Sequence, residues 1–417
     1  MNIAIVGGGA AGFFLAIRVK ELLPSARVIV FERSGGVLSK VRISGGGRCN
    51  LTHSFAHVSD LSQVYPRGAR LLKRLFRSFD HRAAYAWFEA HGVPLVTQED
   101  GCVFPRSQSS ESVIFCLTHH ARMLGVEVCT GVKVKEVFRS GNGFRLDTLS
   151  ADCPAASETF DAVALTTGGA PRGEGHDFLA RLGHEIEPPC PSLFTFNIDH
   201  KPLTALTGIV AEKAQTAFAG TKFRTDGALL ITHWGVSGPA VLKLSAHAAR
   251  YLCEHNYRAP LLISWSGTNN AENVAAELAA LQRSAGSRLV GNVRPEYLQT
   301  RLWHYLLSRA ELSPEKRWSE VGRKSLNRLA NVLTADTYAM VGRGTYKDEF
   351  VTCGGVSLSS VDASTLESRS VPGLFFAGEI LDIDGVTGGF NLTAAWTTAH
   401  TAAEGIARRL SAPNDGR

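Results

Sequence analysis

The chain has 417 residues, of which 44% are hydrophobic and 20% are charged. This length exceeds what a single hydrophobic core supports, and the composition excludes a disordered or fibrous chain, so we expect a globular protein of two or three domains. The net charge of +6 excludes no class of partner by itself, and only its distribution along the chain is informative.

The first 33 residues predict a β-α-β unit: an apolar strand to Val6, a glycine turn, a helix through Leu23 and a strand over 27–31. The chain begins in this strand without the basic segment of a signal peptide, and no apolar run reaches membrane-spanning length, so we expect a cytoplasmic protein. Its eight cysteines form neither a Cys-x-x-Cys pair nor a Cys/His cluster at zinc spacing. We therefore expect reduced thiols and no metal site.

The glycine turn has the spacing of a dinucleotide-binding motif. Gly7 permits the turn, Gly9 lets the backbone approach a pyrophosphate, and Gly12 lets helix and strand pack closely. Glu32, at the end of the second strand, is placed to bond a ribose diol and would repel a 2′-phosphate. The alternative, a turn that only reverses the chain, does not explain why strand, helix, second strand and acidic residue occur in register. The site is predicted to bind FAD or NAD rather than NADP.

Further sheet and helix signals extend this domain to about residue 185. They are a helical pattern over 113–124, short strands over 126–129 and 132–137, and a buried strand over 161–166 that ends at Gly168. We therefore expect one α/β domain, built on a sheet, in this part of the chain.

The pattern of apolar and polar residues changes near residue 188. Alternating segments, such as 194–198 and the short strands near 209–232, predict an antiparallel β part. Helical patterns follow after Gly267, and proline at position 314 indicates a helix start. Sheet signals return beyond about 342, with a buried strand over 374–377 that runs into glycines.

Three regions resemble the BaiN-like NAD(P)/FAD-dependent oxidoreductases. They are residues 43–50 (ISGGGRCN), residues 231–239 (ITHWGVSGP), and a C-terminal set with VTCGGV at 351–356, GEILD at 378–382 and GGFN at 388–391. The resemblance runs from residue 1 to about 408 and is weakest between 240 and 340. It implies an α/β fold with a Rossmann-type FAD-binding domain, three-layered with a mainly parallel sheet, formed by 1–188 and 345–417. An insertion would interrupt it, with a β-barrel-like part at 189–268 and a helical part at 269–344.

The chemistry of these segments suits a flavin. The glycine run 45–47 removes side chains where a flat ring must lie against backbone. Arg48 can balance charge on the cofactor, and Asn50 can bond its polar edge. Ordinary loop glycines remain the alternative for each segment taken singly, but glycines recur after strands throughout the set.

Two short C-terminal motifs complete the predicted site. Gly378 and Glu379 resemble the flavoprotein motif whose acidic residue holds a ribitol hydroxyl, and Gly388 and Gly389 open a helix whose amides would face the N1/C2 edge of the ring. The chain departs from the family in the compact segment 168–176. The predicted FAD-binding residues are Gly7, Gly9, Ala11, Gly12, Glu32, Arg33, Lys40, Ser44, Gly45, Gly46, Gly47, Arg48, Asn50, Val134, Gly168, Gly378, Glu379, Gly388, Gly389, Asn391 and Leu392.

The sequence gives weaker indications of catalytic side chains, as expected where a cofactor carries out the reaction. Arg48 and Cys49 are the candidates, because a thiol beside an arginine near a flavin can have a lowered pKa. The alternative reading makes Cys49 a small buried residue that supports its loop. His233 and Trp234 are candidates to face the substrate, although a single histidine is more often structural.

Positive charge is concentrated in two segments. Residues 281–330 hold ten Lys/Arg against four acids, and residues 67–82 hold six against one, on a predicted helix. Such basic helices are what a polyanion-binding surface requires, while a solvated helix face is the commoner explanation. We expect the basic helices of the insertion to lie on the side of the flavin's open edge.

Three functions follow from these observations. The first is an FAD-dependent oxidoreductase that reduces a carbon–carbon double bond by hydride transfer from flavin N5, with NAD(P)H as electron donor. The resemblance also implies a second, reduction of uridine in ribosomal RNA to dihydrouridine, which the basic segments favour. The third is a flavin redox sensor without turnover. The predicted partner is thus an unsaturated small molecule or ribosomal RNA, with no membrane.

Overall fold

A computed structural model describes residues 1–149, 153–170, 176–344 and 351–412. The chain divides into two compact units. Unit 1 comprises Met1–Pro191 with Phe350–Arg417, and unit 2 comprises Ser192–Glu349. No helix among the described residues combines the length and the apolar character that crossing a membrane requires.

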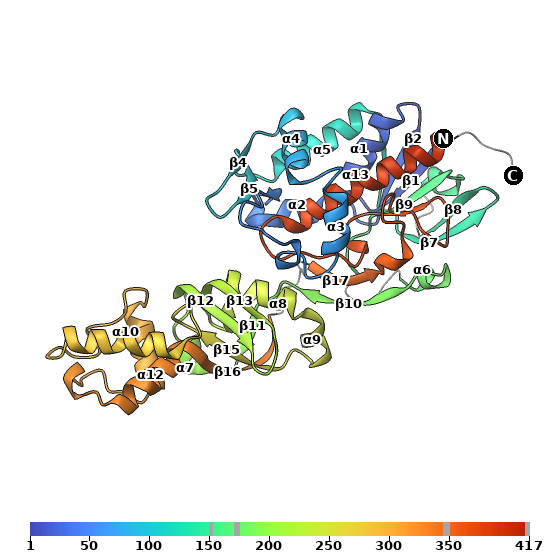
Figure 1. Cartoon of the computed structure of the whole chain (residues 1–417). Helices are drawn as coiled ribbons and strands as arrows, with labels where there is room; N and C mark the ends of the chain where they lie inside the picture. The colour runs from blue at the N-terminus through green and yellow to red at the C-terminus, as the bar shows by residue number, and fades with distance from the viewer. Residues whose placement is uncertain (150–152, 171–175, 345–350, 413–417) are drawn as a thin grey trace. The chain divides into compact units, whose positions relative to one another are not determined.

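Unit 1 is built on a five-stranded parallel sheet in the order β18-β9-β1-β2-β6 (Figure 1). The strands are β1 (Asn2–Val6), β2 (Arg27–Glu32), β6 (Glu127–Thr130), β9 (Ala162–Leu165) and β18 (Leu374–Phe376). The inner strands are continuous runs of buried apolar residues, as expected where both faces of a parallel sheet are covered. Because β18 pairs with β9, the C-terminal part of the chain belongs to the same sheet as the N-terminal strand.

Helices cover this sheet and supply an aromatic core. Phe14, on α1 (Ala10–Leu22), packs edge-on against Trp87 at a ring distance of 4.7 Å and lies 5.5 Å from Trp396. Trp87 and Trp396 come from segments more than 300 residues apart, so their burial ties the two ends of the chain together. The other helices of unit 1 are α2 (Ser39–Ile43), α3 (Ala69–Leu75), α4 (His81–Ala90), α5 (Glu111–Met123), α6 (Asp177–Arg181) and α13 (Phe390–Ser411).

Smaller sheets surround this core. β3 (Thr52–His53), β5 (Cys102–Pro105) and β4 (Leu95–Thr97) form one, β7 (Val134–Ser140) and β8 (Gly143–Thr148) a second, and β10 (Ile186–Ser192) and β17 (Val351–Val356) a third. The third sheet pairs the strand through which the chain leaves unit 1 with the strand through which it returns.

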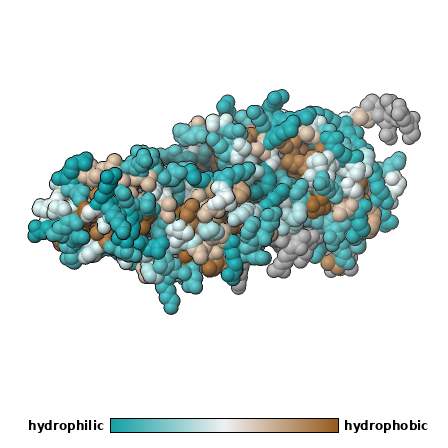
Figure 2. Space-filling view, turned by 60° about the horizontal axis from the view of Figure 1, so that its bottom comes forward, coloured by the Kyte–Doolittle hydropathy of each residue, from teal (hydrophilic) through white to brown (hydrophobic). Residues whose placement is uncertain are grey.

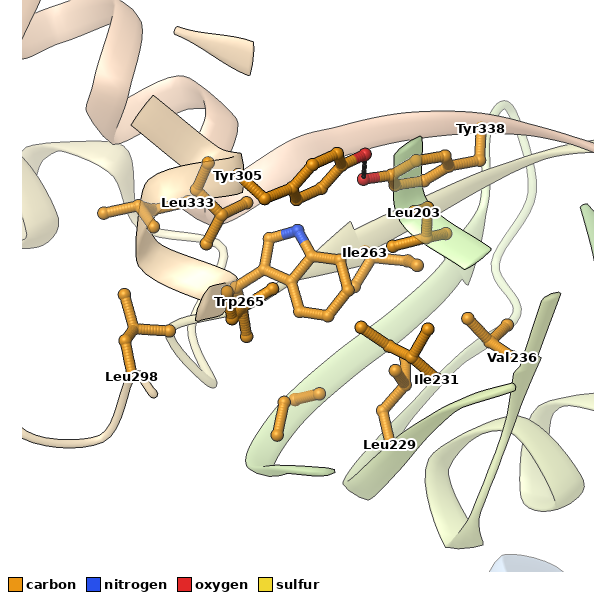
Figure 3. Close-up of a cluster of buried hydrophobic side chains, with 14 of the residues drawn as sticks. Leu203, Leu229, Ile231, Val236, Ile263, Trp265, Leu298, Tyr305, Leu333 and Tyr338 are labelled. Atoms are coloured by element: carbon orange, nitrogen blue, oxygen red, sulfur yellow. Dashed lines mark hydrogen bonds between the residues drawn. The ribbon is translucent and has the colours of Figure 1, made fainter. Parts of the chain in front are cut away.

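Unit 2 contains a closed antiparallel barrel in the order β11-β14-β13-β12-β15-β16. Its strands are β11 (Phe196–Ile198), β12 (Val210–Phe218), β13 (Arg224–Thr232), β14 (Gly235–Ser237), β15 (Ala259–Ser264) and β16 (Asp336–Arg343). Its helices are α7 (Lys201–Thr204), α8 (Pro239–His247), α9 (Ala249–Glu254), α10 (Ala271–Ser284), α11 (Thr300–Arg309) and α12 (Arg323–Ala335). Figure 3 shows part of its core, where Trp265 lies among aliphatic side chains and the hydroxyls of Tyr305 and Tyr338 are 2.8 Å apart.

The predicted fold class, a Rossmann-type parallel sheet with an antiparallel barrel and helices in the insertion, is confirmed. Three local expectations were wrong. The barrel is closed by β16, which follows the helical segment, so residues 269–344 are not helical throughout. The segment after Pro314 forms turns and a short 3-10 helix. Residues 67–82 form α3 and the start of α4 with a break between them, because Asp80 caps a new helix by accepting from the amides of Arg82 and Ala83.

Candidate functional site

The glycine turn after β1 leaves open space at the start of α1. A Cβ atom on Gly7, whose φ is +115°, would lie 2.4 Å from the carbonyl oxygen of Thr166, and one on Gly12 would lie 2.0 Å from that of Gly7. Both glycines are therefore required for packing. Gly9, which caps α1, has no atom within 4 Å of its Cβ position. The helix N-terminus, with its unpaired amides and positive potential, thus remains accessible to an anion such as a pyrophosphate.

Glu32 ends β2 beside this turn. One carboxylate oxygen accepts from the amide of Gly8 at 2.8 Å, and the other accepts from the amide and hydroxyl of Ser34, each at 2.8 Å. A carboxylate has about four acceptor positions, so a ribose hydroxyl can still donate to it. Arg33, the next residue, is exposed, and the amide of Val132 donates to the Glu32 carbonyl oxygen at 2.9 Å.

The C-terminal motif is brought to the same place. The ammonium of Lys40 lies 2.8 Å from a carboxylate oxygen of Glu379, although 339 residues separate them. A Cβ atom on Gly378, whose φ is +78°, would lie 2.9 Å from the Cβ of Ala11 on α1. Gly168, at the end of β9, is also next to Glu379, since its Cβ position is 3.7 Å from the same oxygen. Residues 171–175 of the compact segment 168–176 lie outside the described residues.

The glycine run 45–47 forms an exposed surface without side chains. All three residues are left-handed, with φ of +57°, +68° and +83°, which glycine adopts without strain. Nothing lies within 4 Å of the Cβ positions of Gly46 and Gly47. The hydroxyl of Ser44 donates to the carbonyl of Val41 at 2.8 Å and anchors the start of the run. This backbone surface suits a flat ring.

The side-chain oxygen of Asn50 is a hydrogen-bond acceptor to which no group of the described residues donates. This Oδ1 atom is buried. Leaving such a group unpaired costs about 1–3 kcal/mol, and the imide N–H of a flavin ring is a donor of the required type. The Cβ position of Gly389, the residue that caps α13, lies 2.7 Å from the same atom. Asn50 and the N-terminus of α13 therefore lie side by side, and an amide acceptor beside helix N–H donors fits the imide and carbonyl groups of a flavin.

Three further predicted contact residues are Asn391, Leu392 and Val134, of which Asn391 has a hydrogen-bond partner within the protein. The side chain of Asn391 holds the loop before α13, because its amide group donates to the Gly385 carbonyl and its oxygen accepts from the Gly385 amide, each at 2.8 Å. Leu392 follows it in the first turn of α13 and is half-buried. Val134 starts β7, two residues beyond the amide that bonds Glu32.

The expectation of a lowered pKa at Cys49 was wrong. The side chain is fully buried, and this burial raises the pKa of the thiol to about 12, so it is neutral near pH 7. Arg48 does not offset the burial, because its guanidinium packs 4.2 Å over the ring of Phe104 and donates to Gln108 at 3.3 Å. Cys49 is thus placed to support its loop.

His233 and Trp234 lie in unit 2, in the turn between β13 and β14. The indole N–H of Trp234 donates to the Thr195 hydroxyl at 3.2 Å, and its carbonyl accepts from the amide of Ile198 at 2.9 Å. His233 is exposed and packs edge-on against Trp234 at 4.4 Å. Their proposed role toward substrate stays a prediction.

Sequence reasoning missed a buried ion pair in unit 1. Arg67 pairs through two nitrogens with Asp384, whose side chain is 0% exposed. Arg67 therefore does not belong to a basic surface, contrary to the expectation from residues 67–82, because its charge is paired with Asp384 and its side chain is largely buried. The only sequence signal was the acidic and glycine-rich run at 382–385, which did not indicate its partner.

Comparisons with known proteins agree with this geometry. A family model described as HI0933-like protein Rossmann domain matches residues 1–405. A 3-dehydro-bile acid delta(4,6)-reductase of Clostridium scindens is 27% identical, covering 98% of this chain and 99% of the relative. A ribosomal RNA dihydrouridine synthase of Haemophilus influenzae is 26% identical, covering 97% and 98%. E. coli quinol fumarate reductase FrdA, in a mutant form, matches in structure with a TM-score of 0.51 at 12% identity, covering 100% of this chain and 71% of that chain.

Proposed function

Because this chain belongs to the HI0933-like family and is a flavin-dependent oxidoreductase, we propose that it reduces a carbon–carbon double bond of an unsaturated small molecule, with NAD(P)H as the electron donor. The observation that carries the proposal is the likeness, over nearly both full lengths, to a reductase of a bile acid. When bound, FAD supplies hydride from N5 of its reduced ring.

The chain's own residues have separate tasks in this proposal. The amides around Gly9 would hold the pyrophosphate, Glu32 would bond the ribose, and Glu379 would bond the ribitol. Asn50 would accept from the imide group of the ring. The positive end of α13, a helix of 22 residues, would favour negative charge placed near its first amides.

Reduction under anaerobic conditions tests this function. We expect NADH or NADPH to bleach the visible absorbance of the bound flavin. A conjugated enone of the bile acid type should then restore the absorbance and be recovered as the saturated product. The measurement is stopped-flow absorbance with product analysis by mass spectrometry. Failure of both nucleotides to bleach the flavin, or failure of enones to reoxidise it, would contradict the proposal.

Reduction of uridine in ribosomal RNA is the second candidate, and one observation favours it. Arg323 and Lys324 open α12 and are exposed, and neither has an acidic partner among the described residues. Arg283 and Arg288 are exposed in the same segment. The face drawn in Figure 2 is mostly hydrophilic, with scattered hydrophobic residues. A relative of nearly the same length is a ribosomal RNA dihydrouridine synthase.

Charge reversal at the start of α12 separates the two candidates. If RNA is the substrate, Arg323→Glu with Lys324→Glu should weaken RNA binding about tenfold or more and flatten the dependence of log K on log salt by about one to two units. Acidic residues in the first turn of a helix are favourable, so the variant should stay folded. Binding is measured by filter retention at several salt concentrations.

Reduction of the flavin by NAD(P)H in this variant is the control and should be unchanged, because these side chains lie in unit 2 and belong to no predicted FAD contact. Parent-like RNA binding by the variant would leave only the small-molecule reductase.

A further inference from the structure

Two buried cysteines face each other across the strands that connect unit 1 to the rest of the chain. Cys190 lies on β10 and Cys353 on β17, with their sulfur atoms 3.1 Å apart. Both side chains are buried, with exposures of 3% and 0%. A disulfide bond is about 2.05 Å long, so the sulfurs need to approach by only about 1 Å.

From this geometry we propose that Cys190 and Cys353 form a reversible disulfide that hydrogen peroxide generates and that acts on the proposed flavin site. The site is distinct from the residues predicted to contact FAD. The flavin part of the proposal rests on the proposed function, whereas formation of the disulfide does not.

The reaction balances with peroxide as the oxidant. The Cys353 thiolate attacks one peroxide oxygen, the O–O bond breaks, and a sulfenic acid and water result once a proton is taken up. The Cys190 thiol then attacks the sulfenic sulfur. The S–S bond forms, the S–O bond breaks, and the Cys190 proton leaves in a second water. Two thiols are thereby oxidised by two electrons, and one peroxide is reduced to two waters.

Cys353 is the sulfur of this pair that has a cation nearby. The guanidinium of Arg67 is close enough to interact with it electrostatically, which offsets part of the cost of forming a thiolate in a buried place, although Asp384 and Asp382 reduce this effect. Burial restricts access to small oxidants such as peroxide.

The strand that carries Cys353 also holds the acidic residues of the C-terminal motif. The amide of Thr352 donates to Glu379 at 2.8 Å, and that of Gly354 donates to Asp382 at 3.0 Å. Glycine is needed here because a Cβ atom on Gly354 would lie 2.4 Å from the carbonyl oxygen of Pro188 on β10. β17 is thus packed tightly, and closing the sulfurs should displace Thr352 and loosen its bond to Glu379.

Peptide mapping tests the disulfide. The full-length FAD-bound protein is treated with hydrogen peroxide, quenched with acid, alkylated in denaturant and digested without reduction. We expect a peptide pair linked through Cys190 and Cys353 that disappears on treatment with dithiothreitol. Cys129 and Cys153, whose sulfurs are 3.0 Å apart but half-exposed, show in the same sample that the oxidant was active. Full alkylation of Cys190 and Cys353 while that pair is oxidised would overturn the proposal.

Release of FAD tests the coupling. Oxidised parent protein should release FAD several-fold faster than reduced protein, whereas Cys190→Ala, treated in the same way, should show no change. Dimedone should trap the Cys353 sulfenic acid in this variant. Unchanged release from fully cross-linked parent protein would overturn the coupling. A protein that binds no FAD at all would instead refute the proposed function and leave the mapped disulfide standing.

Discussion

Gly9→Val is expected to abolish FAD binding while the protein stays folded. The Cβ position of Gly9 is in open space and its φ is −89°, so a valine meets no protein atom there. Its branched side chain would instead occupy the place that the pyrophosphate needs at the N-terminus of α1. We expect affinity to fall more than about 100-fold, which corresponds to about 2.8 kcal/mol. The purified variant should be colourless, and titration with FAD followed by fluorescence gives the affinity.

Gly322→Val is the matched control. Gly322 also caps a helix, α12, with an ordinary φ of −74°, and its Cβ position is equally open. This variant should bind FAD as the parent does. Gly12→Val differs from both, because its Cβ position is 2.0 Å from a backbone oxygen, and it should misfold. A yellow Gly9→Val protein with parent-like affinity would refute the site at the start of α1.

Asp384→Asn should destabilise unit 1 by about 3–5 kcal/mol, the second large effect. The substitution leaves the charge of Arg67 without its partner in a place where Asp384 is fully buried and the Arg67 side chain is 11% exposed. Equilibrium unfolding in urea, followed by tryptophan fluorescence, measures the change.

Two controls accompany this prediction. Glu111→Gln breaks the pair with Arg42, in which both side chains are more than half exposed, and should cost less than about 1 kcal/mol. Replacing both partners, Arg67→Met with Asp384→Leu, should restore most of the stability, since no charge remains buried. A loss below about 1 kcal/mol in Asp384→Asn would show that the pair is not carrying the stability assigned to it.

Local patterns were enough for much of the fold. The turn at Gly7, Gly9 and Gly12 requires the strand before it and the helix after it, so its structure could be predicted from spacing alone. The spacing of apolar residues likewise predicted the segments that form α5, α12 and β18. An apolar helix face or a continuous apolar run must be buried wherever it lies. The predicted helix boundaries were wrong where a capping residue sets the start of a helix, as Asp80 does for α4.

Residue types at short, fixed spacings were enough to predict the family and a flavin cofactor, and they also predict which glycines the nucleotide contacts. Which distant residues meet could be seen only in the folded chain. The pairs Lys40 with Glu379, Arg67 with Asp384 and Cys190 with Cys353 each join segments far apart in the chain. The same holds for Cys49, whose high pKa arises from burial by neighbours that no local pattern names. Long-range packing sets such contacts and the polarity around each group, and packing depends on the whole fold.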